Sequence, residues 1–319
     1  MKKTFKTFAA FGFAIFAGCA SVRRPCVRPD GFVDLAEAAL DEEKYEREED
    51  LPSLEALLFN VDGSMIYGQI LVPSSRFAGK RPCAIICHGF AGFTRWDDVA
   101  HELCRAGIVV VIPHHRGAWG SEGEYTVSGC IRDAEALASW AMSDDFAAKY
   151  QTDTNAVHLI GHSMGGNTAV NAASRLEGVR GVAIIAPCDI GYMASKKTRA
   201  EMLDFLIGEG LHVLRRKSDD AVLDDICKNA DAMRFANVAN AIASRKVLLA
   251  TGDYDTVVPT APLDDFWTLL GGGDARHVRF RYPASHSIMG YRKKLAKDII
   301  DFIYCPILVP HSSHLTPNS

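Results

Sequence analysis

The sequence has no C-x-x-C pair and no Cys/His cluster with zinc-ligand spacing, although it contains nine cysteines among 319 residues. We therefore expect no metal site. Five of the cysteines fall in or beside expected core strands and helices, where a free thiol behaves as a small apolar side chain: Cys83, Cys87, Cys104, Cys130 and Cys188. The sequence also lacks a basic stripe, and its formal net charge is −4. These features argue against nucleic acid as a partner and favour a small-molecule substrate.

A long apolar run is also missing at the N-terminus, where Phe8 to Ala17 is too short to span a bilayer comfortably. Lysines precede this run, a pattern typical of an export signal. Its end, Phe16-Ala17-Gly18-Cys19, resembles the bacterial lipoprotein signal, in which the cysteine is lipidated. We expect residues 1–19 to be this signal, and the lipid at Cys19 to be the only membrane attachment, in the cell envelope. Phe16 replaces the usual Leu, so ordinary cleavage to a periplasmic or secreted protein, or a retained anchor, remains an alternative.

The rest of the composition is that of a globular chain, with 48% hydrophobic and 23% charged residues, enough for one α/β domain of above-average size. Residues 20–52 contain prolines and the charge run DEEKYEREED, which is typical of a stalk or linker. The folded domain is expected over residues 53–305. Residues 306–319 are polar and contain proline, which predicts a loose tail.

Within the domain, strand-like runs at 54–60 and 65–72 flank Asp62-Gly63, which predicts a hairpin at an antiparallel edge of the main sheet. Strand and helix patterns then alternate, which predicts a mostly parallel sheet with helices on both faces. The later strands are expected at 83–87, 108–112, 157–160, 182–186, 246–251 and 278–282. Thr94 is expected to cap one helix, and the last helix is expected to begin at about His286.

Residues 189–244 interrupt this alternation with helical patterns and no strand, which predicts a helical cap inserted over the site, before the strand that carries the acid. Phe205, Leu206 and Leu211 either line an acyl or aryl pocket or simply pack the cap on the sheet.

The segment AVHLIGHSMGGNTA, residues 156–169, predicts a buried strand, a sharp turn at Ser163 and a helix. A serine in such a turn occupies strained backbone, so Gly161 and Gly165 satisfy the need for almost no side chain two residues before and after it. The new helix directs its first N–H groups and the positive end of its dipole at whatever Ser163 attacks. The N–H of Met164 is therefore expected to stabilise a developing oxyanion.

A nucleophilic serine needs a base and an acid that orients the base. The acid candidates all follow predicted strands: Asp189, Asp253 and Asp255. The base candidates lie in the last part of the chain: His277, His286, His311 and His314.

Strand–Gly-x-Ser-x-Gly–helix, the upstream HGF loop, a G-x-x-D-x-x-V-P segment and a late histidine together resemble the α/β-hydrolase family over roughly Leu54 to Tyr304. HGFAG, RGAWGSEGEY and GHSMGG are most similar to the feruloyl/cinnamoyl-esterase and monoacylglycerol-lipase-like branch, with serine aminopeptidases close by. The resemblance implies an α/β-hydrolase fold. Its spacing to Val258-Pro259 implies that the acid is Asp255, and the expected position implies that the base is His286.

The resemblance also implies that His88 and Gly89 shape an oxyanion loop in which the N–H of Phe90 is the second donor beside Met164. His114 and His115 stand where this branch usually has an Asp-containing turn.

We therefore expect a serine hydrolase that cleaves small carboxylic esters through an acyl-enzyme and needs no cofactor. A serine peptidase or aminopeptidase is an alternative, because the same triad cleaves both bonds, and a non-catalytic binding protein with this fold is another. Seven carboxylates of the cap leave a subsite for a substrate ammonium open, although solvated helices ordinarily carry such charges: Glu201, Asp204, Glu209, Asp219, Asp220, Asp224 and Asp225.

Overall fold

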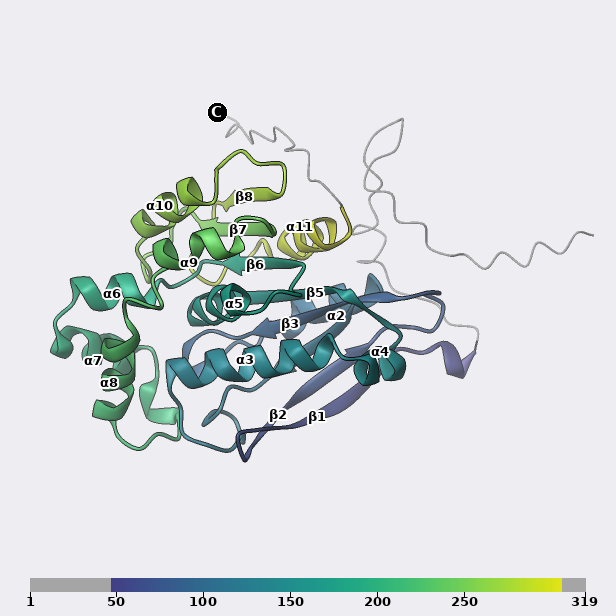
Figure 1. Ribbon diagram of the computed structural model, residues 1–319, viewed down its shortest axis with the longest axis horizontal. Helices are drawn as coiled ribbons and strands as arrows, with labels where there is room; N and C mark the ends of the chain where they lie inside the picture. Colours follow the sequence, from purple (N-terminus) through teal and green to yellow (C-terminus); the bar gives the residue numbers. More distant parts are fainter. Residues whose placement is uncertain (1–46, 306–319) are drawn as a thin grey trace, which may run out of the picture.

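A computed structural model describes residues 47–305, which contain an eight-stranded sheet with the order β1-β2-β4-β3-β5-β6-β7-β8 (Figure 1). The pairs β1–β2 and β2–β4 are antiparallel, and all the following pairs are parallel. The strands are β1 (Ser53–Val61), β2 (Ser64–Val72), β3 (Arg81–Cys87), β4 (Val109–Pro113), β5 (Thr152–His162), β6 (Gly181–Ile185), β7 (Lys246–Gly252) and β8 (His277–Tyr282). The predicted mostly parallel sheet with one antiparallel edge is confirmed.

The antiparallel edge is the predicted hairpin. Asp62 and Gly63 both have positive φ, 51° and 76°, as a two-residue turn of this twist requires. The side chain of Asn60 accepts a hydrogen bond from the Gly63 N–H at 3.1 Å, so the turn is stabilised by a residue of β1 itself.

Helices cover both faces of the sheet. On one face, α2 (Asp97–Arg105) contacts α11 (Arg292–Tyr304), and their apolar residues form one buried cluster with the sheet. On the other face, α3 (Val127–Ala141), α5 (Met164–Arg175), α9 (Phe235–Ile242) and α10 (Ala261–Leu269) contribute to a second and larger cluster. Figure 1 shows α3 and α5 crossing the sheet on the same side, with α4 (Asp144–Tyr150) following α3.

Two predicted helix boundaries are wrong. Helix α2 begins at Asp97 rather than after Thr94, and Trp96 precedes it in left-handed backbone with φ 67° and no side-chain cap. The Thr94 hydroxyl is instead bound by Arg292, and the Trp96 ring is buried in the core, so tertiary packing overrides the local capping preference. Helix α11 begins at Arg292, because Ile288 has φ 52° and ends any helical path from His286.

The insertion between β6 and β7 contains four α-helices and a short 3₁₀ turn. They are α6 (Ile190–Lys196), α7 (Arg199–Gly208), η3 (Leu211–Val213), α8 (Asp219–Asn229) and the α9 described above. Figure 1 shows α6, α7 and α8 grouped at one end of the sheet, whereas α9 packs against α5 and α10. Leu206 and Leu211 are fully buried in the larger core cluster, so these two residues pack the insertion on the domain.

The insertion is bound to the loop after β4 by backbone hydrogen bonds. Arg215 donates its N–H to the Gly117 carbonyl at 2.7 Å, and its own carbonyl accepts the Tyr125 N–H at 2.8 Å. In the same loop, the buried Arg116 guanidinium pairs with the Asp133 carboxylate of α3, with 2.9 Å between Arg116 Nε and Asp133 Oδ2. A buried charge pair of this kind holds the loop to the domain because breaking it would leave one charge uncompensated.

Within residues 47–305, Cys83, Cys87, Cys130 and Cys188 are buried free thiols, and Cys227 is an exposed one. Burial raises the pKa of the Cys87 thiol to about 12, so this group stays neutral and apolar, as predicted for the core cysteines. In the same part of the chain, no helix combines the length and hydrophobicity needed to cross a membrane. Cys19 and the predicted signal, most of the predicted stalk and the predicted tail lie outside the described residues, so lipid attachment stays a prediction.

Candidate active site

Ser163 lies between the end of β5 and the start of α5, as the motif predicts. Its backbone has φ 54° and ψ −121°, a conformation that costs free energy for a residue with a side chain. Ser163 is half-buried, whereas His162 before it and Met164 after it are buried. The turn thus presents one hydroxyl group at the surface of a closely packed region.

Gly161 and Gly165 permit this turn because the backbone has no room for a side chain at either position. A Cβ atom on Gly161 would overlap the Gly165 carbonyl, and one on Gly165 would overlap the carbonyl oxygens of Cys87 and His88. The first turn of α5 therefore lies directly against the carboxyl end of β3.

Gly89 brings the HGF loop against the serine. A Cβ atom at Gly89 would lie 3.2 Å from Ser163 Cβ and 3.0 Å from His162 Nδ1. The next residue, Phe90, begins the 3₁₀ turn η2 (Phe90–Gly92), and Met164 is the first residue of α5. The first N–H groups of a helix have no partner within it, so both loops can offer donors beside Ser163.

His286 and Asp255 are joined by a hydrogen bond of 2.8 Å between Nδ1 and Oδ2, and their side chains are 15% and 2% exposed. The second Asp255 oxygen accepts the N–H groups of Val257 at 2.9 Å and Val258 at 3.3 Å. Burial alone would raise the pKa of the Asp255 carboxyl, but the hydrogen bond from His286, its charge and the two N–H groups outweigh burial and lower it. Asp255 therefore remains ionised beside the imidazole.

The competing acids are engaged elsewhere. Asp253 pairs with Arg281 near the surface, with 2.8 Å between Oδ1 and Nε. Asp189 accepts the N–H of Tyr192 as the cap of α6 and the N–H of Phe235 at 3.1 Å. Of the competing bases, His277 contacts the Ala243 carbonyl, while His311 and His314 lie outside the described residues.

The contact between the serine and the base is indirect in this structure. Within residues 47–305, Ser163 Oγ forms no hydrogen bond with His286 Nε2. His162, the neighbour of Ser163, has its Nε2 3.0 Å from the His286 carbonyl oxygen, and the two rings lie 4.8 Å apart. Catalytic hydrogen bonds are often loose before a substrate is bound, so this arrangement is compatible with a serine–histidine pair.

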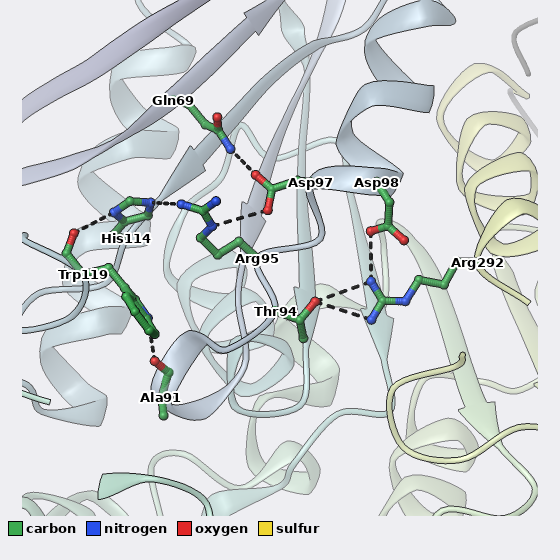
Figure 2. A network of polar contacts seen from close by, with 9 residues as sticks. All are labelled: Gln69, Ala91, Thr94, Arg95, Asp97, Asp98, His114, Trp119 and Arg292. Atoms are coloured by element: carbon green, nitrogen blue, oxygen red, sulfur yellow. Dashed lines mark hydrogen bonds and ion pairs between the residues drawn. The ribbon is translucent and has the colours of Figure 1, made fainter. Parts of the chain in front are cut away.

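Sequence reasoning did not identify His162, Trp96 or Arg292 as parts of the site. The rings of Trp96 and His162 lie 4.8 Å apart, and the Arg292 guanidinium carbon lies 3.9 Å from the Trp96 ring centroid. Arg292 also donates to the Ser287 carbonyl, next to His286, and contacts Thr94 and Asp98 (Figure 2). The stack of Arg292, Trp96 and His162 therefore holds the backbone of His286 and Ser287 in place through two hydrogen bonds to carbonyl groups. The position of His162 within the GHSMGG motif could have indicated it, whereas Arg292 lies in no motif.

His162 is neutral in this stack. Burial, followed by the nearby charge of His286, lowers the pKa of His162 to about 3. Because a carbonyl oxygen can only accept a hydrogen bond, the neutral His162 ring has its proton on Nε2. This N–H donates a hydrogen bond to the backbone carbonyl oxygen of His286. Nδ1 of His162 is then unprotonated, on the side that faces Gly89.

His88 joins the HGF loop to the loop after β4. Its Nδ1 donates to the Gly89 carbonyl at 2.8 Å, and its Nε2 accepts the His115 N–H at 3.2 Å. His115 Nε2 donates to the His88 carbonyl in return, at 3.1 Å. Burial lowers the pKa of His88 well below its usual value and that of His115 to about 4, so both rings are neutral donors and acceptors.

A second polar network lies outside this loop (Figure 2). The Trp119 indole donates to the Ala91 carbonyl at 2.7 Å, and the Trp119 carbonyl lies 3.0 Å from His114 Nδ1. Arg95 contacts His114 Nε2 at 3.0 Å and pairs with Asp97 at 3.3 Å. His114, through Trp119, and His115, through His88, therefore both hold the HGF loop.

A cavity of about 590 Å³ lies beside Asp255, between α6 and the loop that follows β7. This volume is in the range of sites for small organic ligands. The cavity has both charged and apolar walls, formed by Tyr192, Met193, Lys196, Lys197 and the segment from Asp255 to Thr260. Within residues 47–305, no three His, Cys, Asp or Glu side chains are grouped to hold a metal ion.

The sequence profile described as "Alpha/beta hydrolase family" matches residues 84–319. The chain belongs to the alpha/beta hydrolase family. This membership and the eight-stranded sheet confirm the predicted fold class.

Solved structures of this hydrolase fold include several esterases. A highly thermostable carboxyl esterase from Bacillus coagulans, in complex with glycerol, is 20% identical with a TM-score of 0.58, over 79% of this chain and 98% of that chain. Est1E from Butyrivibrio proteoclasticus, with bound ferulic acid, is 18% identical with a TM-score of 0.57, over 77% and 96%. An esterase from Pyrococcus furiosus is 17% identical with a TM-score of 0.56, over 79% and 90%. At these identities the likeness establishes the fold.

The buried neutral histidines predict that acid destabilises this hydrolase. The lowered pKa values belong to His88, His115, His158 and His162, and burial is the first cause in each. In the unfolded chain, a histidine has a pKa of about 6.5, so below that pH the unfolded chain binds protons that the folded chain does not. The stability that these neutral histidines provide above about pH 6.5 is therefore lost as the pH falls toward their folded-state pKa values of about 3 to about 4. We expect the free energy of unfolding to fall by about 1 kcal/mol per buried histidine between about pH 7 and about pH 5.5.

Urea titrations at the two pH values measure this fall. His158→Gln, in β5 away from the serine, should reduce it by about 1 kcal/mol, whereas His212→Gln at an exposed position should leave it unchanged. Equal unfolding free energies at both pH values in the wild type would contradict the prediction.

Proposed function

We propose that the chain is a serine hydrolase that cleaves carboxylic esters through an acyl-enzyme. The observation that supports this most is the buried Asp255–His286 hydrogen bond of 2.8 Å, beside a serine held at φ 54°. Because Nδ1 of His286 faces Asp255, Nε2 is the nitrogen available to take the serine proton. Ionised Asp255 stabilises the imidazolium that this transfer forms.

The proposed reaction has two halves. Ser163 Oγ attacks the ester carbonyl carbon as its proton passes to His286 Nε2, and the N–H groups of Phe90 and Met164 bind the oxyanion. The tetrahedral intermediate then collapses, the C–O bond breaks, and the alcohol leaves with the proton from His286. Water, deprotonated by the same nitrogen, attacks the acyl-enzyme and releases the carboxylic acid and Ser163.

We favour esters over peptides as substrates because five of the seven carboxylates that could form an ammonium subsite have other partners. Asp220 and Asp224 both pair with Arg199, and Asp219 pairs with Arg216. Glu201 accepts from Thr198 in a capping box, and Asp225 binds Ser128 in α3. An aminopeptidase needs free carboxylates to bind a substrate ammonium. The similar fold of Est1E, whose structure holds ferulic acid, supports an ester with a modest or aromatic acyl group.

Covalent labelling tests whether the site is catalytic. A fluorophosphonate probe should label the folded wild type at Ser163 and should not label Ser163→Ala. Hydrolysis of p-nitrophenyl esters by Ser163→Ala or His286→Ala should fall on the order of 10⁴-fold in kcat. A folded wild type that is neither labelled nor active would favour the non-catalytic binding protein.

The two neighbouring aspartates provide a matched pair of variants. Asp255→Asn should lower kcat/KM by about 10³-fold to 10⁴-fold, because the amide no longer supports the protonated imidazole. Asp253→Asn removes the same charge from an exposed ion pair with Arg281 and should change kcat/KM by less than about threefold. The reverse order of effects would transfer the acid role to Asp253.

A substrate panel separates the esterase from the peptidase. The panel comprises p-nitrophenyl esters of increasing acyl length, methyl ferulate and aminoacyl anilides. We expect the esters to have the higher kcat/KM, since five of the seven candidate carboxylates of the insertion are already bound by other groups of the protein. Faster cleavage of the anilides would overturn the ester assignment and leave the serine hydrolase standing.

A further inference from the structure

The cavity beside Asp255 has an unusual balance of charge. Its only carboxylate is that of Asp255, which is 2% exposed and occupied by His286, Val257 and Val258. Lys196 and Lys197 supply two positive charges to the same wall.

Neither ammonium group has a carboxylate within ion-pair distance among the described residues. Lys196 Nζ lies 5.7 Å from the Tyr192 ring centroid, and Lys197 Nζ lies 6.0 Å from that of Phe205. The Glu201 carboxylate interacts electrostatically with Lys197, but its hydrogen bonds are with the N–H and hydroxyl of Thr198. Both cations are thus placed over aromatic rings of the insertion, where their charge is not neutralised.

The remaining walls suit a short carbon chain that ends in an anion. Met193, Val257, Val258 and Pro259 are apolar, while Tyr192, Thr256 and Thr260 carry hydroxyl groups that can donate hydrogen bonds. An ammonium group beside hydroxyl donors is an ordinary set of ligands for a carboxylate. A substrate ammonium, in contrast, would meet two like charges.

We infer that this cavity binds a carboxylate borne by the ester substrate, with Lys196 and Lys197 as its counter-ions. The inference rests on the proposed ester hydrolysis, and it names the substrate class as anionic esters. The position of the cavity supports it, because Asp255 forms part of its wall and also binds the His286 ring. A second chain of contacts joins the cavity wall to the serine, since Met193 Sδ lies 3.3 Å from Cys188 Sγ and the Cys188 N–H donates to the Ser163 carbonyl at 2.9 Å. On this inference, a substituent several carbons from the reacting carbonyl lies in the cavity when the carbonyl is at Ser163.

Two matched pairs of substrates test the preference. Mono-p-nitrophenyl adipate and p-nitrophenyl hexanoate differ by a carboxylate on the acyl side, and p-acetoxyphenylacetate and p-ethylphenyl acetate differ by one on the alcohol side. In at least one pair, the carboxylate ester should have a kcat/KM about tenfold above that of its neutral partner at low salt. Added NaCl should reduce the preference, because the lysines are exposed and screened.

The variant Lys196→Gln/Lys197→Gln should lower the ratio of anionic to neutral kcat/KM about tenfold. The control Lys217→Gln/Lys228→Gln removes the same charge from exposed positions of the insertion outside the cavity and should leave the ratio unchanged. The inference would be overturned if neither substrate pair showed a preference for the carboxylate ester, or if the ratio of kcat/KM fell equally in both double variants. Hydrolysis of the neutral esters would still support the proposed function in either case.

Equilibrium binding keeps the two questions separate. Adipate, titrated calorimetrically into Ser163→Ala, should bind about tenfold more weakly after the two lysines are replaced. If no ester is hydrolysed but adipate binding depends on the two lysines, the proposed function is overturned and the anionic subsite is not. Adipate binding that is absent, or that does not depend on the lysines, would overturn the anionic subsite.

Discussion

The close approach of the first turn of α5 to the end of β3 is the constraint on which the site depends. It is possible only because Gly161 and Gly165 have no side chains, and it forces Ser163 into backbone with φ 54°. The same approach places Gly89 against Ser163. One packing contact therefore sets the position of Ser163, the proposed nucleophile, and of both loops proposed to supply oxyanion donors, and the buried sheet around it compensates the backbone strain.

Three neutral histidines lie in the loops and the strand end beside Ser163. His88, His115 and His162 are each buried, with a lowered pKa, and each uses a ring nitrogen to bind a backbone carbonyl. A positive charge at any of these positions would be costly to bury, and one at His162 would also interact with Asp255 in competition with His286.

The insertion contributes in two ways. Through η3 and Arg215 it packs on the HGF loop and binds the loop after β4, so it takes part in the structure of the oxyanion region. Through α6 it brings two lysines to a cavity whose other wall is the acid loop. The proposed substrate preference and the position of the loop after β4 thus depend on the same segment, in which Glu201 takes part in a helix cap and Asp219 and Asp220 form ion pairs.

The features that depend on neighbouring residues could be predicted from the amino-acid sequence. The turn at Ser163 follows from glycine spacing, the hairpin from Asp62-Gly63, and the parallel sheet from the alternation of strand and helix patterns. Steric limits on φ and ψ and the periods of helix and strand act within a few residues, so they can be inferred locally. Local patterns could not separate Asp253 from Asp255, which lie two residues apart in one loop, although the family resemblance favoured Asp255. The tertiary structure shows that Asp255 binds His286 and that Asp253 pairs with Arg281. It also decided the stack of Arg292, Trp96 and His162, since contacts between distant segments depend on how the whole core packs.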